Sequence, residues 1–172
     1  EDPTAGDDVG DLEAAAADDD SKTLNEMVES ALAWKLLEER GPIGDALKYA
    51  PNSPLPYTGW AKHMHDNGQV AWVSHYKDGR KEGLSIGWHE NGQEATEGAF
   101  KNGKREGLAT MSDKNGKVLR QNHFKNGEME GPYTHWHGNG EKAKKGTYKA
   151  GKLEGLQTEW HENGQAAVEA TF

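Results

Sequence analysis

The sequence lacks cysteine altogether and has few hydrophobic residues for its length. Without cysteine it can form no disulfide, thiolate zinc site or cysteine nucleophile. Only 33% of its 172 residues are hydrophobic, well below the roughly 45–50% of ordinary globular chains, whereas glycine occurs 22 times. The longest apolar runs, such as residues 31–34, are far shorter than the ~20 residues of a membrane-spanning helix. We therefore expect a thin architecture in which much of each element contacts water.

Basic residues are scarce in the first third of the chain. Residues 1–56 carry 14 acidic and 4 basic residues, whereas residues 57–172 carry 15 and 16, together with all eight histidines. The net charge of −9, with no basic stripe, argues against nucleic-acid binding. The first residues, Glu1-Asp2-Pro3, are typical of a mature exported protein. We expect a periplasmic or extracellular location, with a cytoplasmic one as the alternative.

Several residue series recur every 24 residues in the second region. They comprise the turn glycines Gly68, Gly92, Gly116, Gly140 and Gly164, the strand glycines Gly59, Gly83, Gly107, Gly131 and Gly155, and the aromatic residues Tyr76, Phe100, Phe124, Tyr148 and Phe172. A second set of turns ends at residues 79, 103, 127 and 151. Asn-Gly and Asp-Gly favour two-residue hairpin loops, because both central residues of a type I′ turn need positive φ. The series predict ten antiparallel strands in up-and-down order.

A two-residue loop at residues 91–92 fixes the expected register of one repeat. It pairs Gly83 with Phe100. It also pairs Trp88 with Ala95. We interpret the glycine as leaving room for the aromatic ring to lie over bare backbone.

These residues resemble a known family. The pattern Phe/Tyr-Lys-Asx-Gly-Lys-x-Glu-Gly-Leu, followed by Trp-x-x-Asn-Gly-Gln, is similar to MORN repeats, most closely to the bacterial variant found in antitoxin-like proteins. The resemblance spans about residues 46–172 and departs in the third unit, where Ser112 replaces Trp and Asp113 replaces His. It implies a mainly β fold, an elongated single-layer antiparallel meander of five 24-residue hairpin repeats. It also implies attachment to proteins or membrane surfaces.

The N-terminal region is expected to precede the repeats as three segments. Residues 1–20 are rich in Asp and Ala and predict an acidic, flexible tail. A capping box at residues 23–26 and a Gly-Pro stop at residues 41–42 predict an amphipathic helix within residues 21–41. Residues 42–56 then form a linker or capping segment before the repeats at 57–172. The helix either covers the first hairpin or docks on a partner.

Some motifs resemble catalytic or metal sites, but the sequence around them lacks the structure that such sites need. Residues 83–87 match the G-x-S-x-G pattern of hydrolases, but no helix follows them. Histidines at one repeat position lie about 10 Å apart, too far to share a zinc ion, so only the pairs 63/65 and 135/137 could hold an adventitious metal. A further hypothesis is that this histidine series weakens the binding of a partner at about pH 6. We predict no catalytic residue, no cofactor and no physiological metal.

The tryptophans and the helix are the best candidates for binding. We predict partner contacts at Trp60, Trp88, Trp136, Trp160, Leu24, Val28, Ala31 and Trp34, because contiguous apolar patches mark interaction sites. The alternative is that these rings pack on neighbouring Leu residues and hold the single layer together. The function expected is a non-enzymatic scaffold that binds another protein, as an accessory subunit of an exported assembly. A membrane-surface or glycan-binding module and an antitoxin-like protein are the alternatives.

Overall fold

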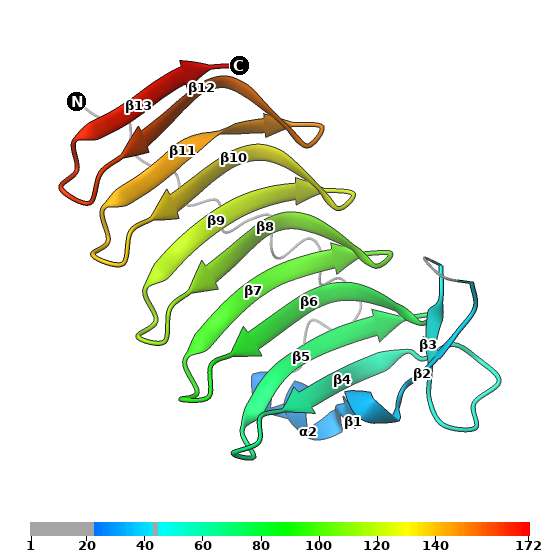
Figure 1. Cartoon of the computed structure of the whole chain (residues 1–172). Helices are drawn as coiled ribbons and strands as arrows, with labels where there is room; N and C mark the ends of the chain where they lie inside the picture. Colours follow the sequence, from blue (N-terminus) through cyan, green and yellow to red (C-terminus); the bar gives the residue numbers. More distant parts are fainter. Residues whose placement is uncertain (1–22, 43–44) are drawn as a thin grey trace.

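The computed structural model describes residues 23–42 and 45–172, which are dominated by one long antiparallel sheet (Figure 1). Its ten consecutive strands pair in chain order, which confirms the predicted meander of five repeats. Repeats 1 to 5 each consist of two successive strands: β4 (Gly59–Met64), β5 (Val70–Lys77), β6 (Arg80–Trp88), β7 (Glu94–Lys101), β8 (Lys104–Ser112), β9 (Val118–Lys125), β10 (Glu128–Trp136), β11 (Lys142–Lys149), β12 (Lys152–Trp160) and β13 (Ala166–Thr171). No helix in the described ranges is long and apolar enough to span a membrane.

The two kinds of turn have different geometries. At residues 102–103, φ is 51° and 80°, and the other turns of this set likewise have positive φ at both central residues, as a type I′ turn requires. At residues 91–92 only Gly92 has positive φ. There the His89 N–H donates to the Gln93 carbonyl over 2.9 Å, closing a longer loop that ends in a left-handed glycine. The two-residue loop predicted at this turn is therefore wrong.

The longer loop changes the register beside it. Gly83 pairs with Phe100 as predicted, but the ladder shifts between Gly87 and Trp88. Trp88 consequently lies opposite Glu94 and not opposite Ala95. The shift recurs at the corresponding point of each repeat and brings two residues of the odd-numbered strand onto one face.

At two of the strand glycines the backbone conformation requires glycine, and no aromatic ring does. Gly107 and Gly155 have φ of 72° and 71°, and a Cβ added to either would meet no atom within 4 Å. The ring predicted to cover these glycines is therefore absent from their surroundings. A ring does approach a glycine elsewhere, since a Cβ on Gly146 would lie 2.9 Å from the Tyr133 ring. Register shifts accompany the strand glycines, which mark bulges in β6, β8, β10 and β12.

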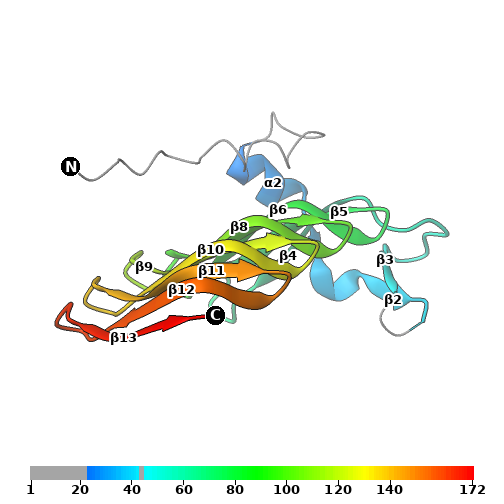
Figure 2. The ribbon, with the colours of Figure 1, turned by 90° about the horizontal axis from the view of Figure 1, so that it is seen from above.

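The N-terminal segment wraps around the free edge of β4 (Figure 2). Helix α2 (Leu24–Ser30) packs on one face, β1 (Leu32–Ala33) pairs in parallel with β4, and the 3₁₀ helix η1 (Trp34–Leu36) lies against the other face. The predicted capping box of Thr23 and Glu26 is present. The predicted helical range of 21–41 is wrong, because backbone pairing with β4 turns residues 31–33 into extended chain.

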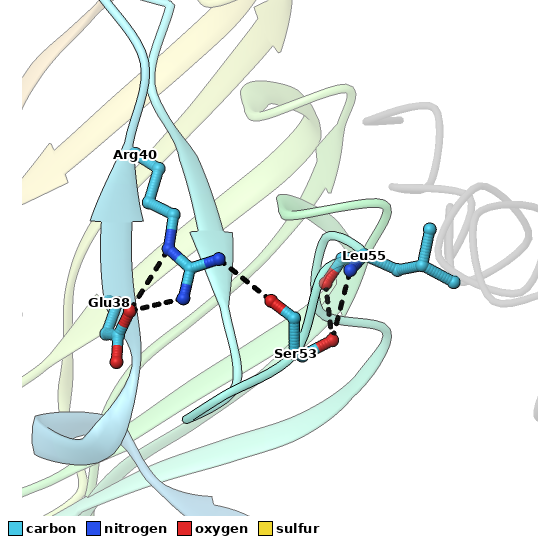
Figure 3. A network of polar contacts seen from close by, with 4 residues as sticks. All are labelled: Glu38, Arg40, Ser53 and Leu55. Carbon is cyan, nitrogen blue, oxygen red and sulfur yellow. Dashed lines mark hydrogen bonds and ion pairs between the residues drawn. The ribbon is translucent and has the colours of Figure 1, made fainter.

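A small two-stranded sheet completes the cap at the type I′ end of the first repeats. It joins β2 (Glu38–Arg40) to β3 (Leu47–Tyr49). The Arg40 guanidinium bonds Glu38 and donates to the Ser53 carbonyl over 2.8 Å, while the Ser53 hydroxyl donates to the Leu55 carbonyl (Figure 3). These bonds hold residues 51–56, the last part of the expected linker or capping segment 42–56, against the two strands. The predicted acidic tail, residues 1–20, lies outside the described residues.

Candidate protein-binding surface

The first repeats hold most of the buried apolar residues, and they lie in two clusters on opposite faces of the sheet. One cluster contains Ala31, Trp60, Val73 and Ile86, with Met27, Leu84 and Trp88 packed against it. The other contains Leu37, Ala61 and Tyr76, with Leu32, Tyr57 and Trp72 packed against it. We call the two sides the α2 face and the η1 face, after the helix that packs on each.

The structure places the predicted binding residues unequally. Trp60 and Ala31 are only 6% and 7% exposed, so they belong to the core and are unavailable to a partner. Trp34 packs edge-on against Trp72 at 6.0 Å on the η1 face, and the half-buried Val28 accepts a bond from Lys62 through its carbonyl. The helix and η1 thus cover the first repeats, which is the first of the two roles predicted for this segment.

Beyond repeat 2, no described element covers the α2 face (Figures 1 and 2). The pairing register continues two rows of large side chains across this face. One row contains Leu84, Leu108, Pro132 and Leu156; the other contains Trp88, Ser112, Trp136 and Trp160. Leu156 is 58% exposed, and Trp136 and Trp160 are half-buried. Three of the predicted tryptophans therefore lie along one apolar track.

Charged pairs interrupt this track at two strands. The register shift beside Trp88 brings Glu94 onto the α2 face, where Glu97 already lies opposite Ile86. Partial desolvation, and secondarily the charge of Glu97, raise the pKa of Glu94, although the residue as a whole is exposed. The equivalent positions two repeats later are Lys142 and Lys145, opposite Trp136 and Thr134. The sequence reasoning missed these pairs, because the predicted register placed Glu94 on the other face.

None of these four charges is neutralised within the described chain. Residues 23–42 and 45–172 supply no ion pair or side-chain hydrogen bond to Glu94, Glu97, Lys142 or Lys145. The neighbouring Lys144, by contrast, lies on the η1 face and pairs with Glu159 at 2.8 Å. The α2 face therefore presents an acidic pair on β7 and a basic pair on β11.

The η1 face carries alternating cations and rings instead. The Lys81 Nζ lies 4.9 Å from the Phe100 centroid, and the Arg105 guanidinium lies 5.3 Å from the same ring and 5.5 Å from Phe124. Burial, followed by the charge of Arg105, lowers the pKa of Lys81. The predicted aromatic series thus acts in packing between repeats.

The recurring histidines connect adjacent repeats. The Nε2 atoms of His65, His89 and His137 lie 2.8–2.9 Å from the carbonyls of Trp88, Ser112 and Trp160. Because a carbonyl only accepts, each Nε2 donates to this bond. These bonds connect each repeat to the next, and the weaker partner binding hypothesised for this series at about pH 6 stays a prediction.

The recurring glutamates form a second connection at the opposite end of the strands. The carboxylates of Glu82, Glu106 and Glu130 accept from the backbone N–H of residues 102, 126 and 150 over 2.6–2.8 Å. Each bond joins the start of one repeat to the type I′ turn that leads into the next repeat. These bonds therefore link neighbouring type I′ turns along this end of the sheet.

The histidine pairs considered for metal binding do not converge. His63 stacks on Trp72 at 6.2 Å, whereas His65 bonds the next repeat. His135 bonds the Asn122 side chain, whereas His137 again bonds the next repeat. No group of three metal-ligating side chains occurs within the part of the chain that the structure describes.

Comparison with known families agrees with this repeat geometry. The model of the MORN repeat variant matches residues 105–126, 129–150 and 153–172, which fall in repeats 3, 4 and 5. Residues 105–172 carry MORN repeats. No curated protein matches it. MORN repeats commonly mediate protein or membrane interactions and are generally non-catalytic. Repeats 1 and 2 share the same period and turn geometry but carry the N-terminal cap.

Proposed function

We propose that the chain is a non-enzymatic MORN scaffold that binds protein through the α2 face of repeats 3 to 5, as an accessory subunit of an exported assembly. The observation that carries the proposal is the uncovered apolar track of Leu108, Pro132, Leu156, Trp136 and Trp160. The same face is covered by α2 in the first repeats. An uncovered continuation of a covered apolar surface is typical of an interaction site.

A pair of exposed apolar residues on adjacent strands provides a matched test. Leu156 on the α2 face is 58% exposed, and Val168 on the η1 face is 51% exposed. We expect Leu156→Asp to abolish capture of a specific protein from native extract and Val168→Asp to leave it intact, as measured by quantitative mass spectrometry.

Fractionation of the same extract tests the location. Recovery of the protein and its partner together in an exported fraction supports the assembly. Equal loss of capture in both variants would overturn the assignment of the face. Binding of glycans or vesicles through Trp136, with no protein captured, would replace protein binding as the function.

A further inference from the structure

The two charged pairs and the two apolar rows of the α2 face are arranged so that this face is complementary to itself. Glu94 and Glu97 lie on β7, and Lys142 and Lys145 occupy the equivalent positions on β11. Strand β9 lies midway between them in the sheet. A two-fold axis parallel to β9, between two copies, places β7 of each copy opposite β11 of the other. Glu94 then faces Lys142 and Glu97 faces Lys145, twice.

We propose that a second copy of this chain binds on the α2 face, forming a two-fold, face-to-face dimer centred on repeat 3. The proposal rests on the proposed protein-binding function and names the partner. An interface of this type is isologous, so each contact occurs twice. The other face-to-face two-fold axis, which runs across the strands, would place β7 on β7 and oppose like charges, which is unfavourable.

The shapes of the side chains fit the same axis. The axis places β8 opposite β10, so the tryptophan row brings Trp136 of one copy against Ser112 of the other. Repeat 3 is the repeat in which the large residue of this row is replaced by serine. In the second row, Leu84 comes opposite Leu156 and Leu108 opposite Pro132. At the centre of the interface a small side chain therefore faces a large one. On both sides of the centre, the apolar rows of the two copies cover each other.

The position of α2 is compatible with this arrangement. It lies over β4 and β5, at the end of the sheet farthest from repeats 4 and 5. Twisted sheets that pack face to face approach most closely at their centre and diverge toward their corners. Each α2 then comes opposite β13 of the other copy, at a diverging end.

The unpaired charges gain partners in the dimer. Burial and the neighbouring Glu97 disfavour the charged form of Glu94 in the single chain. A lysine pair from the second copy offsets that cost and fixes the register, because a shift of one repeat separates the charges by about 10 Å.

Zero-length carbodiimide cross-linking of the full chain tests the contacts directly. We expect dimers joined through Glu94–Lys142 or Glu97–Lys145 peptides, identified by mass spectrometry. Within one chain these residues lie four strands apart, about 19 Å, which is too far for a direct amide. A dimer band that lacks these peptides would overturn the proposed register.

Sedimentation velocity with charge variants provides the second test. We expect Glu94→Lys/Glu97→Lys and Lys142→Glu/Lys145→Glu each to weaken self-association at least about tenfold, since they oppose like charges. A mixture of the two variants should form the heterodimer, because every contact then joins opposite charges. Lys144→Glu, on the η1 face of the same strand, is the matched control and should leave association unchanged.

Ser112→Trp tests the shape argument without changing charge. Tryptophan is the residue of three other repeats at this position, so the single chain should fold normally, as checked by circular dichroism. We expect a monomer, because two tryptophans then meet at the centre. A wild-type chain that is monomeric at high concentration overturns the dimer. If such a monomer still captures a protein through Leu156, the proposed function stands; if it captures none, both fail.

Discussion

At the scale of single residues, positive φ accounts for the glycines within the strands. Gly107 has φ of 72° in open surroundings, whereas Gly138 has equally open surroundings without a positive φ. An alanine at the first position must adopt a left-handed conformation, which costs about 1–2 kcal/mol.

We therefore expect Gly107→Ala to lower the free energy of unfolding by about 1–2 kcal/mol and Gly138→Ala to change it little. Urea denaturation followed by circular dichroism measures both. Equal effects of the two substitutions would show that φ is not the cause.

His135 links stability to pH. Burial, then the charges of Arg120 and Lys144, lower the pKa of His135, which also bonds the Asn122 side chain. A base whose pKa is lowered by folding binds fewer protons in the folded state than in the unfolded state. Stability is therefore retained above the unfolded pKa of about 6.5 and is lost as pH falls through and below it.

His135→Gln removes this titration while keeping a polar side chain. We expect the unfolding free energy of the variant to fall less steeply than that of the wild type between about pH 7 and pH 5. Chemical denaturation at several pH values measures the slopes. Parallel slopes would assign the pH dependence to other groups.

At the scale of elements, the short α2 and β1 act together as a cap. Ala31 is 7% exposed and packs with Trp60, although it lies just beyond the helix. A charge at this position would be buried without a partner, which is among the most destabilising changes known.

We expect Ala31→Asp to destabilise the protein by roughly 3 kcal/mol or more. Asn25→Asp, at an exposed position in the first turn of α2, should have little effect, because an acidic residue is tolerated there. Thermal unfolding distinguishes them, and comparable melting temperatures for the two variants would contradict the packing of α2 on the sheet.

Both turns of each repeat were predicted at the correct positions, but the geometry of one of them was predicted wrongly. Asn-Gly at residues 102–103 forms the predicted type I′ turn, but the same dipeptide at residues 91–92 forms a longer loop. The Asn91 amide donates to the Lys114 carbonyl of the next repeat at 2.6 Å, but this bond is not the cause, because the last repeat closes the same loop through His161 and Gln165 without a following repeat.

At the scale of the whole molecule, burial is unevenly distributed along the sheet. β5 and β6 contain several buried residues, whereas none of those in β8 and β9 is buried. In a repeat protein each unit is stabilised mainly by its neighbours, so local burial sets local stability.

We expect backbone amides of β8 and β9 in the monomer to exchange with deuterium faster than those of β5 and β6. Hydrogen-exchange mass spectrometry of a variant made monomeric by Ser112→Trp measures this difference. Uniform protection along the sheet would indicate a single cooperative unit.

The sequence by itself determined the repeat period, the number and order of the strands and the pairing of Gly83 with Phe100. These follow from local chemistry, because turn residues and alternation act within a single hairpin. The tertiary structure alone decided where α2 ends, which tryptophan is buried and which face carries Glu94. The first two depend on contacts between segments that are distant in sequence: β1 with β4, and Trp60 with Ala31. The third depends on the bulge beside the longer loop. A one-residue bulge is enough to move a charge to the other face, and no local pattern specifies it.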